Sequence, residues 1–507
     1  MTIVMRAPRA AGIGTGALLH RFGSRYSAAL IGVVAAAVCV VGSGTPALWG
    51  DEAASVLSAT RPLPSLFAEL SRVDAVYAVY YLFLHHWVAV FGASDFAVRF
   101  PSAIAAGFAA AGTVVVGRQL FSARIGILAG LVLTVMPQFT RMGMEGRSYA
   151  FGIATAVWLT SHLITTIRRG GHQRRSWILY AIGVAAAIYL FLYLVLLLIV
   201  HLVMILSARL PVRTQLRWAK SVGAGLLLAT PILLLGITQR RQIAFLAHRD
   251  YATLHSVLVG QWVGSTGLAV LAWTLIVVGL LGAVQRRHRG PGMGALTVFA
   301  WLTIPTAVLL AGNAFITPMY SPRYLTFGAP AAAILIALGI HAISHRLVRA
   351  PHRTAVVALL MASIVCVATP SYLAQRTPYA KDGGSDLRQV AQTIHDNAHV
   401  NDAVVFDETV RPSRKPRLAA DLYPDQITGL VNLQLVTPYW KRAGLWDQVA
   451  QLDSLGQPLG HQTVVWAVEL RGSSSTDQIV LEKLGFTLER TIPVHRTVIY
   501  KFVKESP

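Results

Sequence analysis

Charged residues are scarce in this sequence. They make up 13% of the 507 residues, whereas hydrophobic residues make up 54%. Soluble domains carry about 25% charged residues, and a single hydrophobic core stops growing at roughly 250–300 residues. A soluble protein of this length would need several domains with unusually apolar surfaces. The composition therefore excludes an ordinary soluble protein and indicates one that lies in a membrane.

Cysteine and the common short catalytic motifs are also scarce or missing. The two cysteines, Cys39 and Cys366, both lie in apolar segments, so they do not indicate a redox compartment. No Walker loop, GxSxG, HExxH or CxxC pattern occurs. The sequence therefore gives no support to a P-loop nucleotide hydrolase, an α/β-hydrolase or a zinc protease.

Acidic residues are almost absent from the first three quarters of the chain. Residues 1–380 contain 30 Lys/Arg and 7 Asp/Glu, whereas residues 381–507 contain 14 and 15. The net charge of +22 therefore belongs to the apolar part, where the cations fall in short loops. A nucleic-acid-binding protein would gather them on one soluble face, so we expect no nucleic-acid partner.

The apolar segments predict about eleven membrane crossings. They fall at residues 28–49, 98–117, 125–140, 148–167, 176–190, 191–207, 221–237, 264–284, 293–311, 324–343 and 354–373. Residues 76–91 are short and carry His85 and His86, and we interpret them as a helix on the outer surface. The first apolar segment is too long for a secretory signal peptide, so we expect it to be retained.

The charges of the loops predict the orientation. With 76–91 left outside the membrane, the loops on one side contain 20 Lys/Arg and no acidic residue, and all seven acidic residues of the apolar part lie on the other side. Because basic loops stay in the cytoplasm, the N-terminus is predicted to be cytoplasmic. The C-terminal region then lies outside the plasma membrane.

Three regions follow from this pattern. They are a cytoplasmic segment at 1–27, a transmembrane module at 28–375 with a long outer loop at 50–97, and an extracytoplasmic α/β domain at 380–507. In the last region we predict helices at 385–397, 440–454 and 475–484, and strands at 403–407, 463–469 and 497–502. The fold class is thus a mainly α membrane bundle with a small α/β domain that is large enough for its own core.

Acidic residues stand out at the outer end of the first helix. Asp51 and Glu52 follow Trp49-Gly50, and Asp74 opens a second segment, Asp74-Ala75-Val76-Tyr77. Carboxylates at a membrane boundary need partners or water, which favours a functional site. The alternative is that Asp51 or Asp74 caps the helix that follows it.

Cations also occur on the outer side, where membrane proteins usually have few. One cluster contains Arg141, Glu145, Arg147 and Tyr149, a second contains Arg323 and Tyr324, and a third contains Arg240, Arg241, His248 and Arg249. Any one arginine could be an interfacial anchor. Together, beside tyrosines and carboxylates, they predict an outward-facing site for an anion. His85-His86 has no third ligand nearby and is better explained as an anchor.

Four of these segments, in this order, resemble the GT-C class of membrane glycosyltransferases, in the branch of the protein O-mannosyltransferases and the aminoarabinose transferase of lipid A. They are Trp49 to Glu52, Asp74 to Tyr81 with Phe91-Gly92 and Arg99 to Ser102, Glu145 to Ala150, and Pro322 to Leu325. The likeness covers about residues 28–375. Many relatives have Asp-x-His-Pro-Pro-Leu-Tyr-Tyr where this chain has Asp74-Ala75-Val76-Tyr77-Ala78-Val79-Tyr80-Tyr81, which suggests an actinobacterial branch.

The resemblance implies a reaction and roles for residues. The reaction is inverting transfer of a sugar, with mannose favoured, from a polyprenyl-phosphate donor to a cell-envelope glycan, glycolipid (including lipoglycan) or protein. Asp51 would be the general base, with Glu52 binding the acceptor or orienting the loop and Asp74 as the second catalytic carboxylate. The implied donor-phosphate and other pocket residues are Arg147, Arg323, Tyr324 and Arg240 or Arg241, with Glu145, Tyr149 and Tyr81.

Several alternatives stay open at this stage. The sugar could be arabinofuranose, galactosamine or aminoarabinose, and the acceptor and the oligomeric state are not fixed. A transporter or lipid flippase would place charges at the middle of the bilayer, but the predicted helices contain almost none. A non-catalytic scaffold is a further alternative. The resemblance implies no required cofactor and no metal, although one branch of the class uses a divalent ion.

Overall fold

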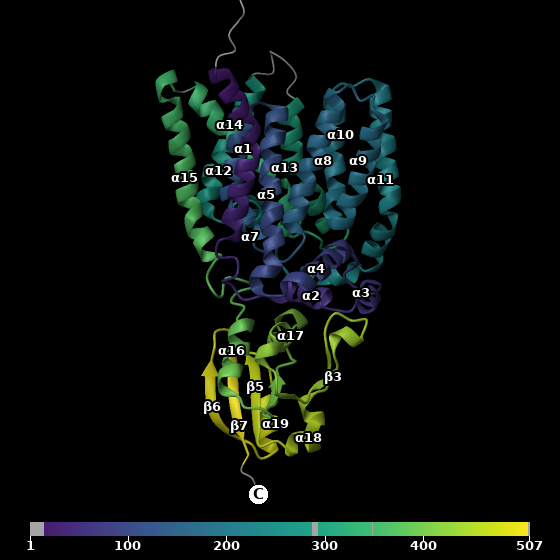
Figure 1. The fold of residues 1–507 in the computed structure, drawn as a ribbon, viewed down its shortest axis with the longest axis vertical. Coiled ribbons are helices and arrows are strands. Elements are labelled where there is room, and N and C mark those ends of the chain that lie inside the picture. The colour runs from purple at the N-terminus through teal and green to yellow at the C-terminus, as the bar shows by residue number, and fades with distance from the viewer. Residues whose placement is uncertain (1–14, 286–292, 347, 505–507) are drawn as a thin grey trace, which may run out of the picture.

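The structure, a computed structural model, describes residues 15–285, 293–346 and 348–504. A bundle of upright helices forms its larger part, and a small α/β domain lies at one end of the bundle (Figure 1). The predicted fold class is confirmed. Of the predicted segment 1–27, residues 1–14 lie outside the described residues, and the first helix begins at Thr15 rather than at residue 28.

The bundle contains every apolar segment that the sequence predicts. Its helices are α1 (Thr15–Val40), α5 (Asp95–Leu120), α6 (Ala123–Val135), α7 (Pro137–Gly143), α8 (Tyr149–Arg168), α9 (Arg174–Leu190), η2 (Leu192–Leu196), α10 (Leu197–Ser207), α11 (Val212–Thr238), α12 (Thr266–Gln285), α13 (Met293–Phe315), η6 (Pro322–Gly328), α14 (Ala329–Arg346), η7 (Ala350–His352) and α15 (Arg353–Ala374). Seven spans in the described residues are long and apolar enough to cross a membrane, or eight if the bent pair α6–α7 counts as one. The protein is thus a multi-pass membrane protein. Eleven crossings stay a prediction, because α9 has only 17 residues and the apolar stretches of α1 and of η2 with α10 are shorter than 18 residues.

Two predicted helix boundaries are wrong, for local reasons. The segment 125–140 bends by 69° between α6 and α7, where Pro137 lacks the amide hydrogen that a continuous helix needs. The first helix ends at Val40 and not at residue 49, and a loop follows it. Inside the bundle, α1 packs closely on α5, because a Cβ on Gly32 would lie 2.9 Å from the carbonyl oxygen of Gly107.

Short helices close the end of the bundle that faces the α/β domain (Figure 1). They are α2 (Gly50–Ala59), α3 (Leu63–Leu70), η1 (Ala75–Tyr77) and α4 (Ala78–Phe91). Helix α4 lies across the end of the bundle instead of running along it, as predicted for residues 76–91 (Figure 1). The segments η3 (Arg240–His248) and η4 (Ser256–Gly260) lie between α11 and α12 in the chain.

The C-terminal domain has a five-stranded mixed sheet in the order β2-β1-β5-β7-β6. Its elements are α16 (Leu387–Asn397), β1 (Ala403–Phe406), η8 (Pro412–Arg414), α17 (Leu418–Leu422), η9 (Pro424–Gln426), β2 (Val431–Asn432), β3 (Leu435–Thr437), η10 (Tyr439–Lys441), β4 (Gln448–Val449), η11 (Leu452–Leu455), α18 (Gly456–Gly460), β5 (Val464–Leu470), α19 (Asp477–Lys483), β6 (Thr487–Pro493) and β7 (Thr497–Val503). The predicted strands at 403–407, 463–469 and 497–502 and helices at 385–397 and 475–484 are confirmed. The predicted helix at 440–454 is wrong, since short turns and strand β4 occupy this segment.

The two parts share a hydrophobic core, which the sequence did not predict. Leu57 of α2 and Leu66 of α3 lie in one buried cluster with Phe406 and Trp466 of the C-terminal sheet. A second, smaller cluster belongs to the C-terminal domain alone. The domain is therefore docked on the short helices by buried apolar contacts, and its position relative to them is fixed.

Candidate active site

A cavity of about 200 Å³ lies where the bundle, the short helices and the C-terminal domain meet. Six of the residues predicted from the sequence line it, from five separate parts of the chain: Asp51, Asp74, Arg147, Arg240, Arg323 and Tyr324. Carboxylates and guanidinium groups therefore converge in one cavity. The sequence predicts such a site, in which arginines lie beside carboxylates.

Asp51 lies in the first turn of α2 and not at the end of α1. Its carboxylate forms an ion pair with the guanidinium of Arg323, and these two side chains keep 23% and 21% of their surface exposed. The alternative role as a helix cap is wrong, because the cap position is Trp49. Asp51 is therefore held in place by Arg323 and remains accessible from the cavity.

Arg147 is buried at the wall of the cavity. Its Nη1 group donates to the backbone carbonyl of Asp51 at 3.2 Å, to Ser55 at 3.2 Å and to the Tyr81 hydroxyl at 3.1 Å, and the guanidinium lies 4.0 Å from the centre of the Tyr77 ring. Its Nε has no hydrogen-bond partner among the described residues. A guanidinium charge at the wall of a cavity is suited to binding an anion there.

Asp74 lies in the left-handed region, with a φ of 56°. Its carboxylate accepts a hydrogen bond from the Tyr81 hydroxyl at 2.8 Å, and it does not cap the helix that follows. The backbone amide of Asp74 donates a hydrogen bond to the side-chain oxygen of Gln242 at 3.1 Å. Burial raises the pKa of Asp74 above its ordinary value, and the charge of Arg147 only partly opposes this shift. Asp74, Tyr81 and Arg147 thus form one hydrogen-bonded chain.

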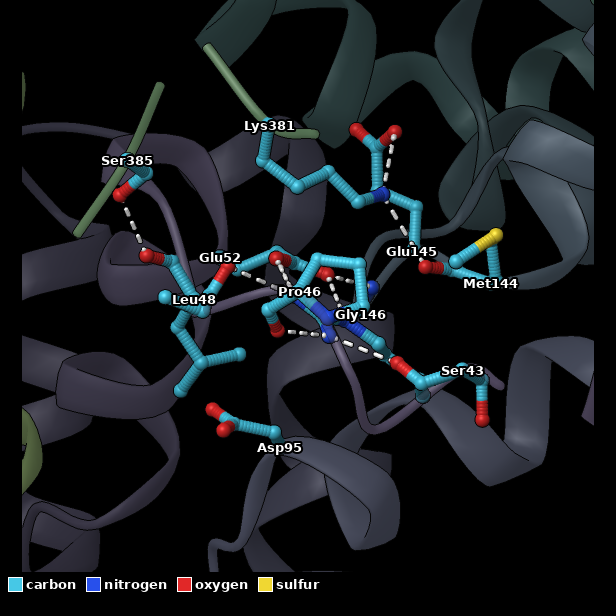
Figure 2. A network of polar contacts seen from close by, with 12 residues as sticks. Ser43, Pro46, Leu48, Glu52, Asp95, Met144, Glu145, Gly146, Lys381 and Ser385 are labelled. Atoms are coloured by element: carbon cyan, nitrogen blue, oxygen red, sulfur yellow. Dashed lines mark hydrogen bonds and ion pairs between the residues drawn. The ribbon is translucent and has the colours of Figure 1, made fainter. Parts of the chain in front are cut away.

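Glu52 points away from the cavity into a closed polar network. It is fully buried and forms hydrogen bonds of 2.7 Å and 2.6 Å with Arg99, and it accepts another from the Gly146 amide at 2.9 Å. Figure 2 shows this network, with Lys381 and Glu145 beside it. Burial alone would raise the pKa of Glu52, but the charges of Arg99 and Lys381 and these hydrogen bonds outweigh it, and the pKa is lowered.

Two residues that were predicted to lie in the pocket, Glu52 and Glu145, therefore do not line it. Glu52 is sealed from the cavity, so it cannot contact an acceptor there, whereas its bond to Gly146 fixes the loop that carries Arg147. Glu145 does not line the cavity either, because it pairs with the buried Lys381 at 3.7 Å (Figure 2). Both were predicted as parts of the site because the sequence does not reveal which way a side chain points.

Of the remaining predicted residues, some line the cavity and others do not. Tyr324 lines the cavity and stacks on Tyr193, with ring centres 4.5 Å apart. Arg240 lines the cavity, whereas its neighbour Arg241 does not. Tyr81 and Tyr149 are buried behind the cavity wall, and only Tyr81 bonds to residues of the cavity.

Sequence patterns give no signal for several residues that shape the site. Arg99 and Lys381 hold Glu52 and Glu145 in the closed network beside the cavity, and no sequence pattern assigns them this role. The C-terminal domain also contributes Ser413, Leu445 and Trp446 to the cavity. No periodicity or motif marked these three, because only the docking of the domain brings them to the cavity.

The described ranges contain no group of three or more His, Cys, Asp or Glu side chains that could hold a metal ion. His85 and His86 each face a backbone carbonyl, of Ala59 and Leu82, at 2.8 Å. The charged groups of the cavity are two carboxylates, Asp51 and Asp74, and the guanidinium groups of Arg147, Arg240 and Arg323. Such a set can accept a proton and stabilise a phosphate.

The fold is that of the GT-C membrane glycosyltransferases. The structure of ArnT from Cupriavidus metallidurans bound to undecaprenyl phosphate aligns over 93% of this chain and 97% of its own, with a TM-score of 0.54 and 15% identity. The apo structure of the same protein covers equal shares, with a TM-score of 0.53 and 14% identity. These likenesses confirm the GT-C fold that the sequence motifs indicated.

Within this fold, residues 78–235 match the family model of the dolichyl-phosphate-mannose-protein mannosyltransferases. The match covers α4, α5 and the helices up to α11, and therefore includes Arg147 but neither Asp51 nor Arg323. A search of curated protein sequences found no significant match.

Proposed function

We propose that this protein is an inverting glycosyltransferase that moves a sugar from a polyprenyl-phosphate donor to an acceptor hydroxyl group. The observation that carries the proposal is the cavity in which Asp51, Arg147 and Arg323 meet. The GT-C fold and the match to a family described by dolichyl-phosphate-mannose chemistry support it. The related ArnT structure with bound undecaprenyl phosphate supports a lipid-phosphate donor.

The donor has one favoured orientation in this cavity. Apolar residues of η2, α11 and η3 form one side, and they include Leu192, Ile243 and Phe245. A polyprenyl tail is insoluble in water, so it lies on this side and continues into the membrane. The phosphate then reaches Arg147 and Arg323, with Arg240 at the rim. Arg147 contributes its buried positive charge at the cavity wall, and Arg323 turns from Asp51 toward the phosphate.

The reaction then proceeds in one displacement. The Asp51 carboxylate takes the proton of the acceptor hydroxyl while the acceptor oxygen attacks the anomeric carbon. The bond between that carbon and the phosphate oxygen breaks on the opposite face, which inverts the carbon. The leaving lipid phosphate gains negative charge, so Arg147 and Arg323 stabilise the transition state more than the bound donor. A positioned base contributes about 10²–10⁴-fold.

Mannose is the sugar that the family match favours, and arabinofuranose, galactosamine and aminoarabinose are the alternatives. Because the basic loops belong on the cytoplasmic side, the cavity and the C-terminal domain face the outside of the plasma membrane. We propose that transfer needs no divalent metal, since the arginines supply the positive charge. The acceptor is a glycan, a glycolipid or a protein of the cell envelope.

The test is a transfer assay with the purified full-length protein in lipid nanodiscs. Synthetic polyprenyl-phosphate donors with each of the four sugars are supplied with octyl α-mannoside, and released lipid phosphate and glycoside product are both measured. Release of lipid phosphate and a product of inverted configuration from the mannosyl donor, unchanged in chelator, are expected. If no donor releases its sugar, the proposed function is wrong, and if chelator abolishes turnover, the metal-free mechanism is wrong.

A further inference from the structure

The C-terminal domain forms the wall of the cavity farthest from the membrane bundle. Leu445 and Trp446 lie on the segment between η10 and β4, and Ser413 lies on η8. In Figure 1 this domain lies beyond the short helices, on the side away from the bundle. These three residues therefore face a molecule in the cavity from the side opposite to the membrane bundle.

The segment that carries Trp446 is rigidly held. Arg61 of the loop after α2 donates to the backbone carbonyls of Arg442, Gly444 and Leu445 at 2.8, 2.7 and 3.0 Å. Arg61 is fully buried and pairs with Glu69 at 2.8 Å. These three carbonyls thus bond to a side chain from another part of the protein. The backbone next to Trp446 is thus fixed to the helix layer that also carries Asp51.

The second contact from the C-terminal domain lies directly beside the proposed base. A Cβ added to Gly50 would lie 2.1 Å from the carbonyl oxygen of Ser413. Only glycine allows the backbone of η8 to lie so close to the first turn of α2. Ser413 is therefore positioned next to Asp51, and the C-terminal domain and the proposed base belong to one rigid site.

The sides of the cavity have different chemistry. The bundle side combines aliphatic residues with the arginines, as a lipid phosphate requires. The outer side is lined by Trp446, which is half-buried and packs on the core beneath it, and by Ser413 and Leu445. A cavity wall that combines a tryptophan with a serine suits a sugar ring, because the C–H face of a sugar packs on an indole and its hydroxyl groups form hydrogen bonds.

We propose that Trp446 is the platform of an acceptor subsite, and that the acceptor is therefore a glycan or glycolipid whose sugar ring packs on this indole. This inference rests on the proposed function. Ser413 lies at the Asp51 end of the subsite, where it orients the acceptor hydroxyl toward the base. Arg61 is a positioning residue, since it holds the segment that carries Trp446 and does not itself line the cavity. The C-terminal domain thus determines which acceptor reaches the anomeric carbon.

The experiment separates the acceptor from the donor. Trp446→Ala, Trp446→Phe and wild type are assayed in nanodiscs with the mannosyl donor. Octyl α-mannoside, octyl dimannoside and a threonine-containing peptide serve as acceptor probes. The matched control is Trp440→Ala, because Trp440 lies nearby on η10, is 43% exposed and does not line the cavity. Thermal unfolding of each variant in the same nanodiscs checks that it is folded.

We expect Trp446→Ala to raise the KM for the octyl dimannoside about tenfold, with the KM for the donor changed less than about twofold. Trp446→Phe keeps an aromatic face and should stay within about threefold of wild type, and Trp440→Ala within about twofold. An unchanged acceptor KM in a folded Trp446→Ala protein overturns the inference. So does transfer by the wild type to the peptide alone. Wild type that releases no sugar from any donor overturns the proposed function as well.

Discussion

Asp51 and Glu52 are neighbours in the chain, yet they belong to two different regions of the molecule. Asp51 pairs with Arg323 in an open cavity, where about a fifth of each side chain stays exposed. Glu52 pairs with Arg99 in a closed network, where neither side chain is exposed. Each region contains a carboxylate and a guanidinium, but only the first leaves room for a substrate.

The two ion pairs differ in whether their groups are free to bind a substrate. In the closed network, backbone carbonyls and amides occupy the remaining donors and acceptors, and the carbonyls of Ser43 and Pro46 both bond to Arg99 at 2.7 Å. A charge pair of this kind fixes a structure, since every group is satisfied. In the cavity, the partly exposed ion pair of Asp51 and Arg323 can exchange partners with a bound phosphate. Four predictions test this contrast.

The largest effect is expected from Asp51→Asn. It removes the proposed base but keeps the size of the side chain, so kcat should fall about 10²–10⁴-fold while the protein stays folded. The measurement is the initial rate of sugar transfer with saturating donor. Asp250→Asn is the control, because Asp250 is exposed, lies on the loop between η3 and η4 and does not line the cavity. Normal turnover by Asp51→Asn would show that the base is another group.

The next effect is on stability. Glu52→Gln leaves the buried charge of Arg99 without its counter-charge and should lower the free energy of unfolding by about 3–5 kcal/mol. Thermal unfolding in detergent measures it. A double variant with methionine at both positions removes the charges together and should recover most of the loss. If Glu52→Gln unfolds like the wild type, the closed network does not depend on this pair.

The pH dependence of sugar transfer should show whether Asp74 contributes to the reaction. Its carboxylate accepts a hydrogen bond from the Tyr81 hydroxyl, and that hydroxyl accepts one from Arg147. Burial raises the pKa of Asp74, so it becomes protonated at a pH above the usual range for a carboxyl group. We expect kcat/KM for the donor to fall as the pH decreases through that raised pKa. The Asp74→Asn variant should have a kcat/KM for the donor about tenfold lower near neutral pH, and this value should no longer fall as the pH decreases. The same acidic decrease in the variant would exclude Asp74 as its origin.

The smallest effect is expected at the rim of the cavity. Arg240→Ala should raise the KM for the donor about fivefold or less, because exposed charges contribute little and salt weakens them. Arg241→Ala should leave this KM unchanged, since Arg241 does not line the cavity. Donor titrations at low and high ionic strength make the comparison. Equal effects of the two substitutions would mean that Arg240 has no specific contact with the donor.

The sequence alone was sufficient to predict the membrane bundle, the surface helix at 76–91 and most of the C-terminal strands. Their signal is local, because a run of apolar residues or an alternating pattern lies within one element. It also placed Asp51, Asp74, Arg147 and Arg323 in one site, through motifs that occur in a known order. The ends of elements at Val40 and Pro137 were less well predicted, since they depend on a few backbone bonds.

Only the tertiary structure decided which charges form the cavity and which form the closed network. Glu52 and Glu145 looked like site residues in the sequence, but Arg99 and Lys381 hold them away from it. It also decided that Trp446, almost 400 residues after Asp51, lies at the same cavity. The reason is physical: whether a polar group binds a substrate or fixes the fold depends on which groups reach it in space, and docking of distant segments determines that.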